Sequence, residues 1–79
     1  MIERKSFPVD EEYSINIVTE QMKDGQWAVV TSIVQQTPTG ENTTDLPVGD
    51  ERFATEAAAE EAGLRQGRDW LDRNMPRAA

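Results

Sequence analysis

Apolar residues recur with the spacing of an α-helix along the C-terminal third of the chain. At about 100° per residue they form one stripe, which consists of Phe53, Ala57, Leu64, Leu71 and Met75. Thr55 is suited to cap the N-terminus of this helix. Pro76 disfavours helical angles in the residue before it. The pattern therefore predicts one helix over about residues 55–74.

Three residues within this helical segment need a structural explanation. Gly63 and Gly67 lie on the flank of the stripe, although a glycine inside a helix costs about 1 kcal/mol relative to alanine. Close approach of the helix to a sheet explains both glycines, and we favour it over a bend near Gly67. Glu60 lies within the stripe, where we expect its long side chain to reach water rather than to form a buried functional carboxylate.

Upstream of the helix, two segments have the pattern of β-strands. In residues 13–22, apolar and polar residues alternate at first, and residues 26–36 are rich in β-branched residues. Asp24-Gly25 between them favours a tight hairpin. A two-residue loop would pair Ile15 with Val34. A loop longer by one residue would exchange the faces of the second strand relative to the first.

Both faces of this predicted hairpin are partly apolar. One face holds Tyr13, Ile15, Ile17, Ala28, Val30 and Val34. The other holds Val18, Met22, Trp27, Val29 and Ile33. One helix covers one face, so the second must be covered by the N-terminal segment, by residues 46–53 or by another chain. The interaction face predicted on this basis consists of Met22, Trp27, Val29 and Ile33.

The remaining segments complete the predicted fold. Residues 1–12 are rich in charge, and we expect them to form a loosely ordered lead-in to the domain. We expect residues 76–79 to form a frayed tail. Residues 35–45 lack apolar side chains and predict a mobile loop or a polar hairpin turn. Residues 45–53 predict a short edge strand. The whole is a single α+β domain, 1–79, in which one C-terminal helix covers an antiparallel sheet of three to four strands.

Charge and hydropathy exclude several classes of partner. The 79 residues include 8 basic and 15 acidic side chains, for a net charge of −7. This charge disfavours binding to nucleic acid or to anionic membranes, because both attract cationic surfaces. No apolar run approaches the length of a membrane span, and the start of the chain lacks a secretory hydrophobic stretch. We therefore expect a cytoplasmic protein.

The sequence offers little for catalysis. The chain contains no cysteine and no histidine, which removes disulfides, zinc sites built from thiolate or imidazole, and the commonest general base near neutral pH. The acidic residues lack the spacing of a calcium loop, and the glycines are too scattered for a phosphate-binding loop. We expect no enzymatic activity and no metal or cofactor site.

Three short motifs carry a resemblance to known proteins. They are Asp24-Gly25-x-Trp27-x-Val29, then Phe53-x-Thr55 leading into the alanines at 57–59, and Gly67-x-x-Trp70-Leu71-Asp72. The combination resembles small uncharacterised bacterial proteins, some of them associated with prophages. The resemblance implies an antiparallel sheet followed by one C-terminal helix and a bacterial or prophage origin. It implies no functional residues.

Two functional hypotheses follow from these patterns. The first is a small non-enzymatic protein-interaction module, acting alone or as a homodimer, whose contact face includes Met22, Trp27, Val29 and Ile33. The alternative is an acidic regulator that mimics the charge of nucleic acid and binds a basic groove on a partner protein.

Overall fold

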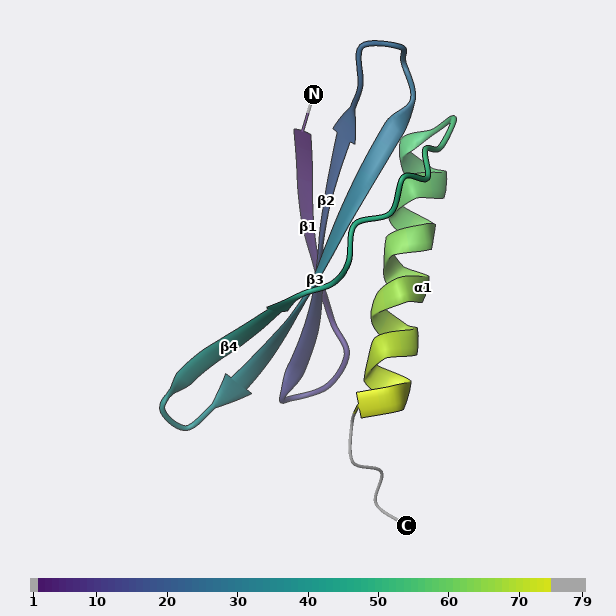
Figure 1. Cartoon of the computed structure of the whole chain (residues 1–79). Coiled ribbons are helices and arrows are strands. Elements are labelled where there is room, and N and C mark those ends of the chain that lie inside the picture. Colours follow the sequence, from purple (N-terminus) through teal and green to yellow (C-terminus); the bar gives the residue numbers. More distant parts are fainter. Residues whose placement is uncertain (1, 75–79) are drawn as a thin grey trace.

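A computed structural model describes residues 2–74 of the chain (Figure 1). Four strands form one antiparallel sheet in the order β1-β2-β3-β4, with the bounds β1 Ile2–Pro8, β2 Tyr13–Gln21, β3 Trp27–Thr37 and β4 Gly40–Asp45. The helix α1, Glu56–Asn74, follows the sheet. The predicted α+β fold with one C-terminal helix is thus confirmed. Met75 and the predicted tail at 76–79 lie outside the described residues.

The prediction of a loosely ordered lead-in is wrong for residues 2–8, which form β1. This strand pairs with β2, placing Phe7 opposite Ile15, and Phe7 packs against the core. Asp10 stabilises the turn that follows, because its Oδ1 accepts hydrogen bonds from the backbone N–H groups of Glu12 and Tyr13, both at 2.8 Å. Charged residues suit an exposed edge strand, so the charge of this segment did not signal disorder.

The hairpin between β2 and β3 has a three-residue loop rather than the predicted two-residue loop. Gly25 N donates to Met22 O at 3.0 Å, and Met22 N donates to Gln26 O at 2.7 Å. Gly25 has a φ of +88°, as expected for the left-handed residue that follows a type I turn in such loops. The register therefore shifts by one residue. Ile15 pairs with Ile33, and the two faces of β3 exchange.

The fourth strand lies earlier in the chain than predicted. β4 occupies part of the segment expected to be a loop or a polar hairpin turn, and it forms a hairpin with β3. All its residues are exposed, so it needs no apolar side chain. The edge strand predicted over 45–53 is wrong, because residues 46–52 are irregular. At its two ends the segment is bonded to the sheet: Leu46 N donates to Thr31 O at 2.9 Å, and Phe53 forms paired backbone hydrogen bonds with Trp27 of 2.7 and 2.9 Å.

The core lies between α1 and one face of β2 and β3 (Figure 1). Its buried apolar side chains are Ile15, Ile17, Ile33, Leu46 and Leu71. A methyl group on Gly63 would lie 2.8 Å from Val29 Cγ2, and one on Gly67 would lie 2.8 Å from Ile15 Cγ2. Close approach to the sheet, the favoured explanation for both glycines, is confirmed.

The buried face of α1 is centred on these glycines rather than on the predicted stripe. Ala59, Gly63, Gly67 and Leu71 are its buried residues, whereas Ala57 is exposed. The apolar pattern gave too little weight to glycine, whose backbone presents a small surface suited to close packing. Thr55 is the N-cap as predicted, because its Oγ1 accepts a hydrogen bond of 3.1 Å from Ala58 N.

Glu60 does not simply extend into water. Its Oε2 accepts a hydrogen bond of 2.7 Å from Lys5 Nζ, and Glu56 Oε1 lies 4.0 Å from the same nitrogen. The ion pair connects the edge strand β1 to α1. The hydrogen bond from Lys5 to Glu60, and the negative charge of Glu60, raise the pKa of Lys5 above its ordinary value.

The close contact at Gly63 predicts that alanine at this position lowers stability, although alanine favours a helix more than glycine does. Gly63→Ala should destabilise the fold by about 1–2 kcal/mol, because crowding against the stiff Val29 side chain exceeds the gain in helix propensity. In a Val29→Ala background the same substitution should cost less, because Thr31 Oγ1 at 3.0 Å is then the nearest atom to the added methyl group. Urea unfolding of the two single variants and the double variant measures the coupling. Equal effects of Gly63→Ala in both backgrounds would contradict close packing.

The ion pair between β1 and α1 predicts a local change in dynamics. Lys5→Met should accelerate amide hydrogen exchange severalfold in residues 2–8 while leaving β3 unchanged. Lys23→Met, at the exposed hairpin tip, is the matched control. The contribution of the charged Lys5 is fully present below the pKa of lysine in the unfolded chain. It is lost as the pH rises through the raised pKa of the folded state. Unchanged exchange in β1 would rule out a stabilising role.

Candidate functional site

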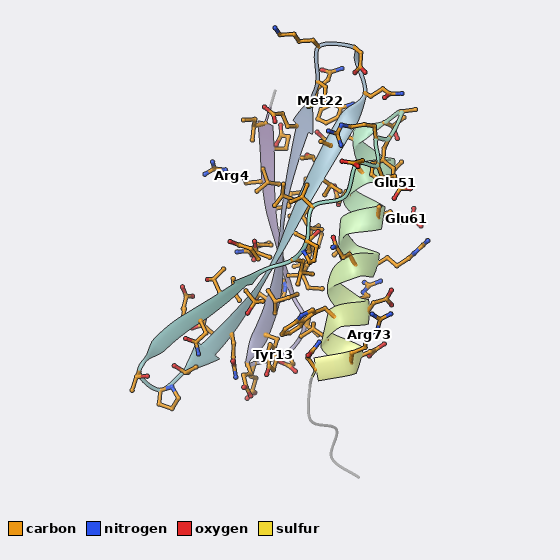
Figure 2. The ribbon with its side chains drawn as sticks, viewed as in Figure 1. Arg4, Tyr13, Met22, Glu51, Glu61 and Arg73 are labelled. Atoms are coloured by element: carbon orange, nitrogen blue, oxygen red, sulfur yellow. The ribbon has the colours of Figure 1, made fainter. Side chains whose placement is uncertain are left out.

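The sheet has a second face that points away from α1, which we call the open face. Successive side chains of a strand point to opposite faces, and the residues that contact α1 identify the covered one. Figure 2 shows Arg4 on the side of the sheet away from the helix. The open face consists of Ile2, Arg4, Ser6, Pro8, Ser14, Asn16, Val18, Glu20, Ala28, Val30, Ser32, Val34, Gln36, Glu41, Thr43 and Asp45.

Four short polar side chains cross the middle of the open face. Each pairs with the next across the sheet, one from each strand, and we call them the polar row: Ser6, Asn16, Ser32 and Asp45. Ser32 Oγ donates to Asp45 Oδ1 at 2.9 Å. Asn16 Oδ1 is buried and has no hydrogen-bond partner within residues 2–74. A buried acceptor without a donor costs about 1–3 kcal/mol, so this oxygen lowers the stability of the isolated chain.

Apolar side chains lie beside the polar row. Val18 pairs with Val30, and Val30 remains 38% exposed. Ile2, at the start of β1, is 54% exposed. A shallow depression of about 270 Å³ lies between β1 and β2, where Arg4 and Asn16 contribute to its lining. The open face thus combines the exposed Val30 and the half-buried Val18 with the polar row, whereas Val34 on the same face is buried.

Charges on the open face are divided between its two margins. Arg4 lies on the edge strand β1, whereas Glu41 and Asp45 lie on the opposite edge strand β4. Glu20 occupies β2, opposite Ala28 of β3. The positive and negative margins are therefore separated by the full width of the sheet.

The four residues predicted as an interaction face do not share one exposed surface. Ile33 is 2% exposed and belongs to the core, and Val29 packs against that core. Trp27 is half-buried and forms the bridge to Phe53. Met22 is exposed at the hairpin end (Figure 2). The one-residue shift in register explains this, because it moves Trp27, Val29 and Ile33 to the covered face.

The residues of the open face were missed, although the sequence contains a signal for them. In the observed register, Ile15 and Ile17 share a face with Ile33, and the polar Asn16 and Ser32 share the other. The predicted register mixes these classes. Choosing the loop length that best separates polar from apolar residues would have favoured the three-residue loop.

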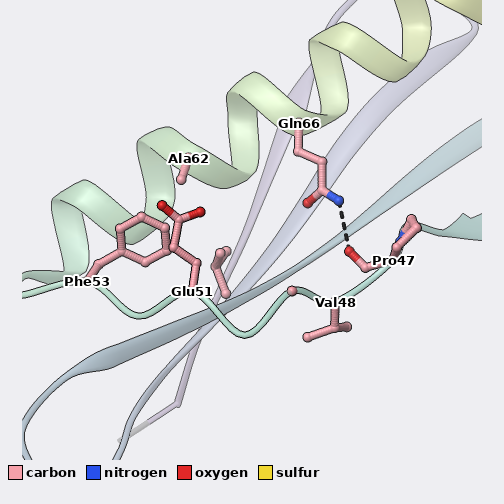
Figure 3. Close-up of a pocket in the computed structure, with 8 residues that line it drawn as sticks. Pro47, Val48, Glu51, Phe53, Ala62 and Gln66 are labelled. Atoms are coloured by element: carbon pink, nitrogen blue, oxygen red, sulfur yellow. Dashed lines mark hydrogen bonds between the residues drawn. The ribbon is translucent and has the colours of Figure 1, made fainter.

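A second candidate is a depression between α1 and the irregular segment 46–53 (Figure 3). It has a volume of about 310 Å³, and its mixed lining includes the apolar side chains of Val48 and Phe53. Gln66 Nε2 donates to Pro47 O at 2.8 Å, which holds the segment against the helix. The Glu51 carboxylate also lines it, but the Gln66 donor is already engaged. The depression therefore lacks a group of convergent polar atoms that would orient a ligand.

The acidic turn at 10–12 acts in structure rather than as a cation site. Asp10 accepts backbone hydrogen bonds within the turn, and Glu12 accepts one from Gln35. Partial burial, followed by the charges of Glu12 and Asp10, raises the pKa of Tyr13 above its ordinary value. Within residues 2–74, no group of three or more acidic side chains is placed to hold a metal ion.

Comparison with known proteins adds no further assignment. No protein-family model, curated protein or solved structure matches this chain. The resemblance to small bacterial and prophage-associated proteins is therefore not confirmed, and what is shown is the small antiparallel sheet with one helix. In the described part of the chain, α1 is too polar to cross a membrane.

The buried acceptor predicts that Asn16 lowers the free energy of unfolding of the isolated chain. Asn16→Val should raise the free energy of unfolding by about 1 kcal/mol, because it removes an unsatisfied acceptor and places a β-branched residue in a strand. Urea unfolding at low protein concentration measures this effect. Ser14→Val, on the same face and strand, is the control for β-propensity. Equal gains from both variants would contradict a specific cost at Asn16.

Proposed function

We propose that this chain is a non-enzymatic protein-interaction module that binds a protein partner through the open face. The observation that carries this proposal is the buried Asn16 acceptor, which lacks a donor and lies beside the exposed Val30. α1 packs on the opposite face, so it supplies neither a donor nor apolar cover here.

The composition of the open face supports contact rather than simple hydration. A solvated face of an antiparallel sheet is ordinary when its side chains are polar. Here Val18 and Val30 are cross-strand neighbours near the centre, and a partner would remove them from water while offering a donor to Asn16. Burial of apolar area and satisfaction of a polar group would then stabilise the same complex.

The non-enzymatic part of the proposal rests on the side-chain inventory. The chain has no histidine or cysteine, and in the depression beside Gln66 the side-chain donor of Gln66 is already bonded to Pro47 O. A cytoplasmic location stays a prediction from the sequence.

The acidic-regulator hypothesis has less support. Its carboxylates would need to form ribs on one surface, like the phosphates of nucleic acid. Instead the acidic residues are divided among the turn at 10–12, the open face, the segment 46–53 and α1. Several also hold internal contacts, such as Asp10 with the turn and Glu60 with Lys5.

Two exposed valines provide a matched test. Tagged wild-type chain, Val30→Glu and Val48→Glu would be expressed in the host that encodes the chain, and captured proteins quantified by mass spectrometry. Val30 lies on the open face, whereas Val48, 61% exposed, lies beside α1. Capture should fall at least about tenfold for Val30→Glu and persist for Val48→Glu. Equal capture by all three forms would contradict the proposal, provided that their melting curves match.

A further inference from the structure

We propose that the protein on the open face is a second copy of this chain, related by a two-fold axis parallel to the strands and midway between β2 and β3. This inference rests on the proposed function and identifies its partner. Such an axis reverses the order of strands, so β1 of one copy lies over β4 of the other and β2 lies over β3. A two-fold interface requires a self-complementary surface, and three features of the open face meet that requirement.

The first feature is the polar row. Reversal of strand order places Ser6 opposite Asp45 of the partner subunit and Asn16 opposite Ser32 of the partner subunit. The Ser6 hydroxyl can then donate to the carboxylate of Asp45 of the partner subunit. Each Ser32 hydroxyl, which donates to Asp45 within its own chain, is released to donate across the interface. Asn16 Oδ1, the acceptor without a partner in one chain, thereby gains a donor.

The second feature is the pair of valines beside that row. Val18 and Val30 are cross-strand partners on β2 and β3, so the same axis places Val18 opposite Val30 of the partner subunit and Val30 opposite Val18 of the partner subunit. Four valines meet at the centre of the interface. Sheets packed face to face bury side chains in this manner when their strands are nearly aligned.

The third feature is the division of charge between the margins. Arg4 on β1 lies two residues along the strand from Ser6, the residue opposite Asp45 of the partner subunit. Its long side chain can reach that carboxylate diagonally, and the contact occurs twice in the dimer. Glu20 lies opposite Ala28 of the partner subunit, so no two carboxylates of the central strands oppose each other. A net charge of −7 on each copy opposes association at long range, which makes these local opposite-charge contacts necessary. An unrelated cationic partner would leave Arg4 opposite a positive surface.

A charge exchange tests the arrangement. Arg4 and Asp45 lie on opposite edges of one sheet, separated by β2 and β3, so they cannot contact each other within one chain. Arg4→Asp and Asp45→Arg should each weaken the dimer at least about tenfold, because each variant loses the diagonal opposite-charge contact twice and brings like charges near each other in its place. An equimolar mixture of the two variants should restore dimerisation, since the mixed dimer contains two opposite-charge contacts. Sedimentation velocity of the wild-type chain, the two variants and their mixture, with circular dichroism to verify folding, measures these effects.

A measurement on the wild-type chain keeps the test independent of the variants. Isotope-filtered NMR of a mixture of labelled and unlabelled chains should show contacts between Val18 of one copy and Val30 of the other. A monomer at NMR concentrations, a dimer without these contacts, or variants that mixing does not rescue would each overturn the second copy as the partner.

The two proposals fail in distinguishable ways. If the wild-type chain is monomeric but Val30→Glu loses a captured protein, the open face still binds a partner and only the second copy is wrong. If Val30→Glu alters neither capture nor sedimentation, the open face is not a contact surface and both proposals fall.

Discussion

Close packing of α1 on the sheet is the constraint on which the rest of the structure depends. Gly63 and Gly67 let the helix backbone approach Val29 and Ile15 to a distance that a methyl group would not permit. The hydroxyl of Thr31 donates to Gly63 O at 3.3 Å across the same contact. A helix held this closely fills the covered face of β2 and β3. In a chain of 79 residues, the described residues leave no second layer for the other face, which is why that face is the natural place to seek a function.

The hairpin loop decides which side chains fill the core. With three residues in the loop, the largest apolar residues of β3 join Ile15 and Ile17 beneath the helix. The shorter polar residues and Val30 then form the open face. The third residue of the β2–β3 loop thus sets the register that produces the polar row and its unsatisfied acceptor. Core formation and the candidate interface are specified by the same local choice of backbone geometry.

Elements with strong local patterns could be predicted from the sequence, and those that depend on neighbours could not. The helix, its Thr55 cap and the hairpin follow from periodicity, capping and turn chemistry. β1 and β4 were not identified as strands, because edge strands tolerate charge and polarity and their pairing partners lie elsewhere in the chain. The open face was missed because Asp-Gly suits loops of two or three residues. The ion pair of Lys5 with Glu60 joins residues far apart in sequence, so no local pattern could reveal it.

The two hairpins of this sheet differ in how much change in length they tolerate. Removal of one residue between Met22 and Gln26 would turn Ile33 outward and Val30 inward, so insertions and deletions should be selected against at that loop in evolution. At the β3–β4 tip, residues 38–39 are exposed, so added residues can lengthen the loop as long as the pairing of β4 with β3 is kept. That tip is where foreign peptides, labels or an added domain could be grafted without disturbing the interior.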